Sequence, residues 1–149
     1  MADNLAYKSG DSWAYDNEES NVYKYGRLYD WETAKTVCPS DWHLPSDNEW
    51  MQLINYLGGD SIAGGKLKSI SDWVSPNTRA SNESGFSAIA GGGLIEGSFN
   101  YVGLLGGFWS STQMDATGAW YRFLSNDKAN AGQYHLGKKY GISVRCMRD

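Results

Sequence analysis

The segment CPSDWHLPSDNEW, residues 38–50, brings a cysteine, a histidine and acidic side chains close together in the sequence. Thiolate, imidazole and carboxylate groups at suitable spacing can bind a metal or pair a nucleophile with its base. The segment offers one histidine, His43, and its acids Asp47 and Glu49 are already explained as helix-capping residues. We therefore expect His43 to be a structural or surface histidine, and we expect no metal site.

The two cysteines, Cys38 and Cys146, lie too far apart for a CxxC redox motif or a self-sufficient cysteine zinc cluster. They are either two free thiols or one long-range disulfide. The other histidine, His135, is even more isolated, and without a GxSxG-like elbow a Ser/His/Asp triad has little support. No pair of acids stands out for glycoside hydrolysis. We expect no catalytic residues and a protein that is not an enzyme.

Two other segments could hold a ligand by residue type alone. The acidic stretch DNEE at 16–19 lacks the EF-hand arrangement of calcium ligands, so a solvated turn is expected there. The run GGG at 91–93 lacks both a following G-K-[ST] and the dinucleotide spacing, which favours a turn over a phosphate loop. No cofactor is expected, and calcium binding is an open alternative that no specific motif supports.

The chain of 149 residues fits one domain, 1–149, because this length can bury a sizeable core. Its 18 glycines and 14% aromatic residues predict many tight turns around bulky packing. A net charge of −4 disfavours nucleic acid and anionic membranes as partners. No transmembrane run or leader is visible, so the chain is either cytosolic or a domain whose export signal was removed.

Two helices follow from capping residues and apolar spacing. Asp30 can cap a helix over 31–38 whose inward positions include Cys38, and Pro39 ends it. Ser46 and Glu49 form a capping box for a second helix, which Gly58 terminates.

Strands are predicted where short aromatic and β-branched runs lie between glycines. These runs are DWHLP at 41–45, GFSAIA at 85–90, FWSST at 108–112, AWYRFL at 119–124 and GISVRCM at 141–147. In the last run, period two places Cys146 on an apolar face with Ile142 and Val144.

The stretch at 110–139 mixes aromatic side chains with small polar ones, which is the chemistry of adaptable binding loops. The alternative is that its aromatic residues are core and its polar residues are loop. The candidate ligand-binding residues are Gln113, Asp115, Trp120, Tyr121, Arg122, Asn126, Asp127, Asn130, Gln133, Tyr134 and His135.

An ordered series of segments resembles the Fibrobacter succinogenes major paralogous domain (FISUMP) family. The series is YGRLYDWETA, CPSDWHLPSDNEWMQLINYLGG, GKLKS, SGFSAIAGGG, GSFNYVG, GFWSST and GISVRCMRD, and the resemblance covers nearly the whole chain. It implies a C-type-lectin-like α+β fold with two helices, a twisted antiparallel sheet, a long loop-rich region and adjacent termini. It also implies a disulfide between Cys38 and Cys146.

The resemblance further implies a secreted or lipid-anchored bacterial protein at the cell surface. We expect a non-catalytic binding module that recognises a glycan or protein ligand through a loop-rich C-terminal half. One alternative is a structural surface or adhesion protein, and another is a diversified receptor-binding protein. A formylglycine-generating type of enzyme is the least favoured class, because Cys146 has no second cysteine close in sequence.

Overall fold

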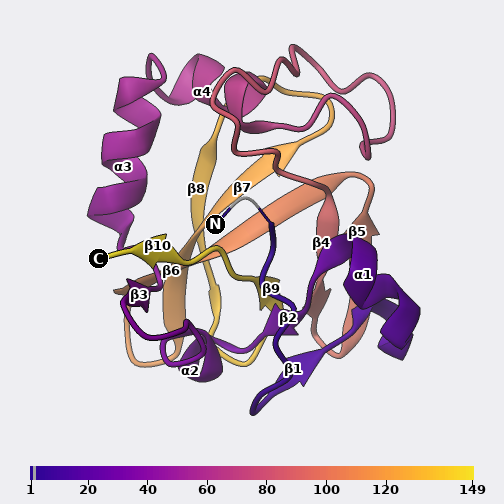
Figure 1. Cartoon of the computed structure of the whole chain (residues 1–149), viewed down its shortest axis with the longest axis vertical. Helices are drawn as coiled ribbons and strands as arrows, with labels where there is room; N and C mark the ends of the chain where they lie inside the picture. The colour runs from indigo at the N-terminus through magenta and orange to yellow at the C-terminus, as the bar shows by residue number, and fades with distance from the viewer. Residues whose placement is uncertain (2) are drawn as a thin grey trace.

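The computed structural model describes residue 1 and residues 3–149 of the chain. It is a mixed α+β structure with a curled sheet and few helices (Figure 1). The longer helices, α3 (Asp47–Tyr56) and α4 (Asp60–Leu67), follow one another along one side of the sheet (Figure 1). Met1 donates from its amino group to the carbonyl of Cys146 at 2.8 Å, so the two ends of the chain are adjacent, as expected.

The main sheet is built around β6 (Leu105–Gln113), which pairs along one edge with β7 (Gly118–Ser125) and through β7 with β8 (Gly132–Gly137). Along its other edge, β6 meets β4 (Gly91–Ile95) and β9 (Ile142–Ser143), both in parallel orientation. The pairs of β4 with β5 (Ser98–Val102), of β9 with β2 (Leu28–Tyr29), and of β2 with β1 (Ser12–Trp13) are antiparallel. The predicted antiparallel sheet is therefore a mixed one.

The helix predicted at 31–38 is a single turn, α2 (Trp31–Ala34). Asp30 caps it as expected, accepting from the backbone N–H of Thr33 at 2.8 Å. The prediction is wrong beyond Ala34, where the β-branched Thr36 and Val37 precede Pro39 and each disfavours continued helix. Val37 then packs into the core beside the disulfide of Cys38.

The capping box at α3 is confirmed. Ser46 Oγ accepts from the backbone N–H of Glu49, and the Glu49 carboxylate accepts from the backbone N–H of Ser46. Trp50 and Ile54 bury one face of α3 against the sheet, and Gly58 ends the helix with φ of 104°.

The helix α4 was not predicted, because Gly64 and Gly65 indicated a turn. A Cβ built on Gly64 would lie 2.1 Å from the carbonyl oxygen of Asn130, and one on Gly65 would lie 2.5 Å from that of Arg79. These glycines therefore let two other backbone segments approach the helix closely. The remaining helix, α1 (Val22–Tyr25), is a single turn that follows two 3₁₀ turns, Tyr15–Asn17 and Glu19–Asn21. The acidic stretch at 16–19 is thus an exposed turn, as expected.

Several strand predictions need correction. Residues 85–90 belong to a long loop over 68–90, and only Ala88 forms a bridge, with Lys68. The GGG run is part of β4 instead of a turn, and residues 41–45 contain only the two-residue strand β3 (Trp42–His43). This strand pairs with β10 (Met147–Arg148) in a separate two-stranded sheet. Which strands pair, and which glycines allow another backbone to come close, depends on segments far apart in the sequence. Local composition does not encode these non-local contacts.

The loop-rich region also lies elsewhere than predicted. Most of 110–139 is strand, in β6, β7 and β8, whereas the long loop precedes β4 and lies at the top of Figure 1. Polar and aromatic residues alternate along these strands, so their composition resembles that of a loop although their backbone is paired. No helix in the described part of the chain is long and apolar enough to cross a membrane.

The disulfide between Cys38 and Cys146 is present and closes a sequence separation of 108 residues. Cys146 is buried with Tyr29, Trp31 and Trp109 in one of two core clusters. A loop of this length contributes about 4–5 kcal/mol in the chain-entropy model of the unfolded state, although measured values are often lower. The second cluster contains Trp50, Ile54, Leu67, Phe108 and Leu124, and it joins α3 and α4 to the sheet.

Candidate functional site

The strand pair β7 and β8 divides the predicted ligand residues between two faces. Trp120 pairs with His135 and Arg122 with Gln133, whereas Tyr121 pairs with Tyr134. Because side chains alternate along a strand, the first two pairs point to one face and the third pair to the other. The sequence prediction treated these residues as one surface, and the structure separates them.

Arg122 lies on the face that is covered by α3. Its side chain is only 4% exposed and donates from Nη2 and Nε to Asp47 Oδ1, at 2.8 and 3.2 Å. Gln133 donates from Nε2 to the other oxygen of Asp47 at 2.9 Å, and the backbone N–H of Asp47 donates to Thr112 Oγ1. Arg122 and Gln133 therefore hold the start of α3 against the sheet.

On the same face, the Trp120 and His135 rings meet edge to face with their centroids 5.8 Å apart. His135 also stacks with Tyr134 at 4.8 Å, with an angle of 20° between the ring planes. These contacts orient Tyr134, whose side chain belongs to the opposite face of β8.

Four other predicted residues lie in the turns and loops that connect the strands. Asp115 Oδ1 accepts from the backbone N–H groups of Thr117 and Gly118, at 2.7 and 2.8 Å, and these bonds lower the pKa of Asp115. Asn126 donates to two carbonyls of the long loop, and Asp127 accepts from the hydroxyl of Ser125. The Asn130 backbone lies against Gly64 of α4. Gln113 is exposed at the end of β6.

The opposite face of the sheet forms a hollow of about 280 Å³, which we call the tyrosine hollow. Its lining comes from all five strands of the path β5-β4-β6-β7-β8, because the sheet curls, and from Ile142 of β9. The lining residues are Gly92, Gly93, Ile95, Tyr101, Leu105, Gly107, Tyr121, Phe123, Tyr134, Leu136 and Ile142. Two predicted residues, Tyr121 and Tyr134, are thus brought together here with Tyr101, Phe123 and Leu136, which the sequence reasoning missed.

Tyr101 and Tyr134 are the exposed members of the tyrosine hollow, at 53% and 57% of their surface. They come from β5 and β8, the two outer strands of the five. Tyr121 lies deeper, and burial together with the neighbouring Tyr134 and Tyr101 raises its pKa to about 12. The Tyr121 hydroxyl therefore keeps its proton at neutral pH and can both donate and accept a hydrogen bond.

The backbone of Tyr101 is left-handed, with φ of 66°. Across from Tyr101, on the neighbouring strand β4, lies Gly92. It stands between Gly91 and Gly93, which both pair with β5, and its φ is also positive, 64°. A Cβ on Gly92 would lie 2.3 Å from the carbonyl oxygen of Asn100, so this position excludes other residues. Ten of the described non-glycine residues have a positive φ, and Tyr101 is the aromatic one among them. The conformation is uncommon for tyrosine, and outliers of this kind gather at functional sites.

A sequence signal for this hairpin does exist. Ile95 pairs with Ser98 across a two-residue turn, Glu96-Gly97, in which both residues have positive φ. This is the backbone of the type I′ hairpin turn, but its usual sequences are Asn-Gly and Asp-Gly. Glu at the first position weakens the signal.

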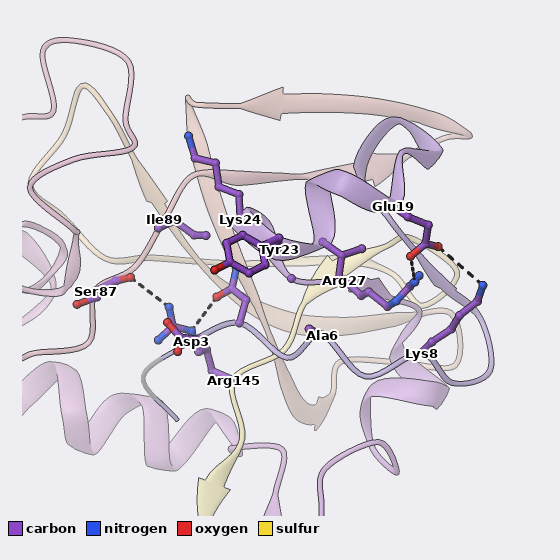
Figure 2. A pocket seen from close by; sticks show the side chains of 13 residues that line it. Asp3, Ala6, Lys8, Glu19, Tyr23, Lys24, Arg27, Ser87, Ile89 and Arg145 are labelled. Atoms are coloured by element: carbon purple, nitrogen blue, oxygen red, sulfur yellow. Dashed lines mark hydrogen bonds and ion pairs between the residues drawn. The ribbon is translucent and has the colours of Figure 1, made fainter.

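A second hollow, of about 560 Å³, lies between the N-terminal segment, α1 and the long loop; we call it the N-terminal hollow (Figure 2). Figure 2 shows Glu19 between Arg27 and Lys8, and both cations form ion pairs with it. Arg145 donates to Asn4 Oδ1 and to the carbonyls of Phe86 and Ser87.

The charged side chains Lys8, Glu19, Arg27 and Arg145 of the N-terminal hollow thus form ion pairs and hydrogen bonds within the protein. Lys24 likewise pairs with Asp72 of the long loop at 3.1 Å. Arg27 Nε has no hydrogen-bond partner in the described part of the chain, but that atom is buried, so a ligand in the hollow would not reach it. The tyrosine hollow is therefore the better candidate site.

His43 is a structural histidine, as expected. Its Nδ1 lies 2.5 Å from Asp149 Oδ1 and its Nε2 lies 3.0 Å from Glu49 Oε1. The hydrogen bond with Asp149, and then that with Glu49, raises the pKa of His43. Across residues 1 and 3–149, no group of three or more His, Cys, Asp or Glu side chains lies close enough together to hold a metal ion.

Comparison with protein families identifies the chain. The family described as Fibrobacter succinogenes major domain matches residues 1–148, and the chain therefore belongs to this family. Neither the search of curated proteins nor the search of solved structures gave a significant match.

Proposed function

We propose that this protein is a non-catalytic binding module at the bacterial cell surface and that its ligand, a glycan or a protein, binds in the tyrosine hollow. The observation that carries the proposal is the exposure of Tyr101 and Tyr134, from the two outer strands, around one hollow. Exposed aromatic side chains around a concave surface offer large contact area at low conformational cost.

Burial of the side chain does not account for this arrangement. A tyrosine that is more than half exposed contributes little burial, and Tyr101 adds the cost of a left-handed backbone. A ligand contact by Tyr101 would explain why an exposed side chain retains a strained, left-handed backbone.

The disulfide supports an extracellular location, because such bonds persist in oxidising compartments. It also uses both cysteines of the chain, which argues against an enzyme of the formylglycine-generating type. The C-type-lectin-like fold and the single domain over 1–149 stay predictions. A structural adhesion protein is the second candidate, and it predicts that removal of the exposed tyrosines leaves adhesion unchanged.

The test is NMR titration of the ¹⁵N-labelled protein with a panel of soluble oligosaccharides and peptides. If the proposal holds, at least one ligand perturbs the amides of Gly92, Gly93 and Gly107, which line the tyrosine hollow. The Tyr134→Ala variant should show this response only at higher ligand concentration. Tyr56→Ala is the matched control, because Tyr56 is 87% exposed at the end of α3 and does not line the hollow. Perturbation confined to other surfaces would overturn the assignment of the site.

A further inference from the structure

Resting on the proposed function, we infer that the tyrosine hollow recognises an uncharged pyranose ring of a glycan, and that it discriminates against acidic sugars. The inference follows from the charge, the geometry and the size of the hollow.

The lining of the tyrosine hollow contains no Asp, Glu, Lys, Arg or His in the described part of the chain. A carboxylate that entered it would lose hydration without gaining a cationic partner, which is a costly exchange. Glu96, which adjoins the lining residue Ile95, adds a negative charge at the β4–β5 turn. Uronic acids and sulfated sugars are therefore disfavoured, whereas a neutral ring has no charge to desolvate.

The side chains that line the hollow match the two kinds of surface on a pyranose. Its C–H groups form apolar faces, which pack against aromatic rings such as those of Tyr101, Tyr134 and Phe123. Its hydroxyls point outward from the ring edge and need groups that both donate and accept. The tyrosine hydroxyls of the hollow, including the protonated Tyr121, have this capacity.

The volume sets the size of the bound group. A hollow of about 280 Å³ holds about nine waters at ~30 Å³ each. That space suits one sugar ring and part of the next. A standard protein interface covers about 800 Å² on each partner, so a hollow of this size favours a small rigid group over a protein surface. For about twelve non-hydrogen atoms, a ligand efficiency of about 0.35–0.45 kcal/mol per atom corresponds to a dissociation constant of roughly 0.1–1 mM.

The experiment uses matched probes that differ in charge. The protein is titrated by NMR with neutral oligomers of glucose, galactose, mannose and xylose, with a galacturonic acid oligomer, and with a proline-rich peptide. Galactose and galacturonic acid differ in one carboxylate on the same ring. We expect at least one neutral oligomer to perturb the hollow with a dissociation constant of roughly 0.1–1 mM, and the acidic oligomer to bind at least about tenfold more weakly.

Tyr134→Ala should weaken binding of the neutral oligomer by about tenfold, whereas Tyr56→Ala should not change it. EDTA should have no effect, because the lining offers no carboxylate for calcium. Equal binding of the acidic oligomer, loss of binding in EDTA, or a response of the hollow to the peptide alone would overturn the inference and leave the proposed function standing. If no probe perturbs the hollow, both fail.

Discussion

The substitution Tyr101→Gly tests the contribution of Tyr101 to ligand binding separately from its contribution to the stability of the fold. Tyr101 is half exposed and has φ of 66°, a region that glycine adopts freely. The substitution therefore removes an aromatic contact and a backbone strain at the same time.

The opposing contributions to stability can be estimated from the structure. A left-handed conformation costs an L-residue about 1–2 kcal/mol, and the greater freedom of glycine in the unfolded chain costs about 0.5–1 kcal/mol. The net effect of glycine on the backbone, which is relief of strain less the entropy cost, thus stabilises the fold by roughly 0.5–1 kcal/mol. Loss of a half-buried aromatic side chain destabilises by about 1 kcal/mol. We expect the free energy of unfolding of Tyr101→Gly to stay within about 1 kcal/mol of the parent value, a shift in Tm of at most about 4 °C.

The assay is urea unfolding of the parent, Tyr101→Gly and Tyr101→Ala. The alanine variant loses the same contact but keeps the strained backbone, so it should be less stable than the glycine variant by roughly 0.5–1 kcal/mol. Binding of a ligand of the tyrosine hollow should weaken by about tenfold in both variants. A loss above about 2 kcal/mol in Tyr101→Gly would mark Tyr101 as a structural residue. Equal stability of the two variants would refute the strain argument.

Three further predictions concern the scaffold. Gly64→Ala, which stabilises an ordinary helix, should destabilise α4 by at least about 2 kcal/mol in thermal unfolding, because the new Cβ would lie 2.1 Å from the Asn130 carbonyl oxygen; a rise in Tm would contradict the packing. Asp47→Ala should cost about 3 kcal/mol in urea unfolding, because the buried Arg122 would lose its hydrogen-bonded partner and keep only the more distant carboxylate of Asp60, at 3.8 Å; a change under about 1 kcal/mol would show that the pair contributes little. Because folding raises the pKa of His43, its contribution to stability is fully present below about pH 6.5 and is lost as pH rises through the folded value. The stability difference between the parent and His43→Gln should therefore shrink from about pH 6 to pH 9, and a difference that grows over this range would reverse the assigned sign.

How much the sequence reveals depends on whether an interaction is local. The start of α3 was predictable because Ser46 and Glu49 satisfy each other's backbone groups within one turn. The start of α2 at Asp30 was predictable for the same reason. The family resemblance covered the chain in order, and it gave the pairing of Cys38 with Cys146, which composition had left open.

The helix α4 and the strand β4 were not predictable, because glycine has two opposite meanings. Gly64 and Gly92 indicated turns by residue type, yet each allows another backbone to approach within a regular element. Only the position of the neighbouring segment distinguishes a turn from a close approach.

The sequence by itself determined the helix caps, the two longest strands and the family. It left open whether the aromatic residues of 110–139 are surface or core, and the tertiary structure decided which tyrosines line one hollow. Strand alternation turns Arg122 toward α3 and Tyr121 away from it. Tyr101 and Tyr134 meet at one hollow because the sheet curls through non-local pairs such as that of Gly92 with Gly106. Curl and register depend on contacts across the whole sheet, and a local pattern of residues does not specify them.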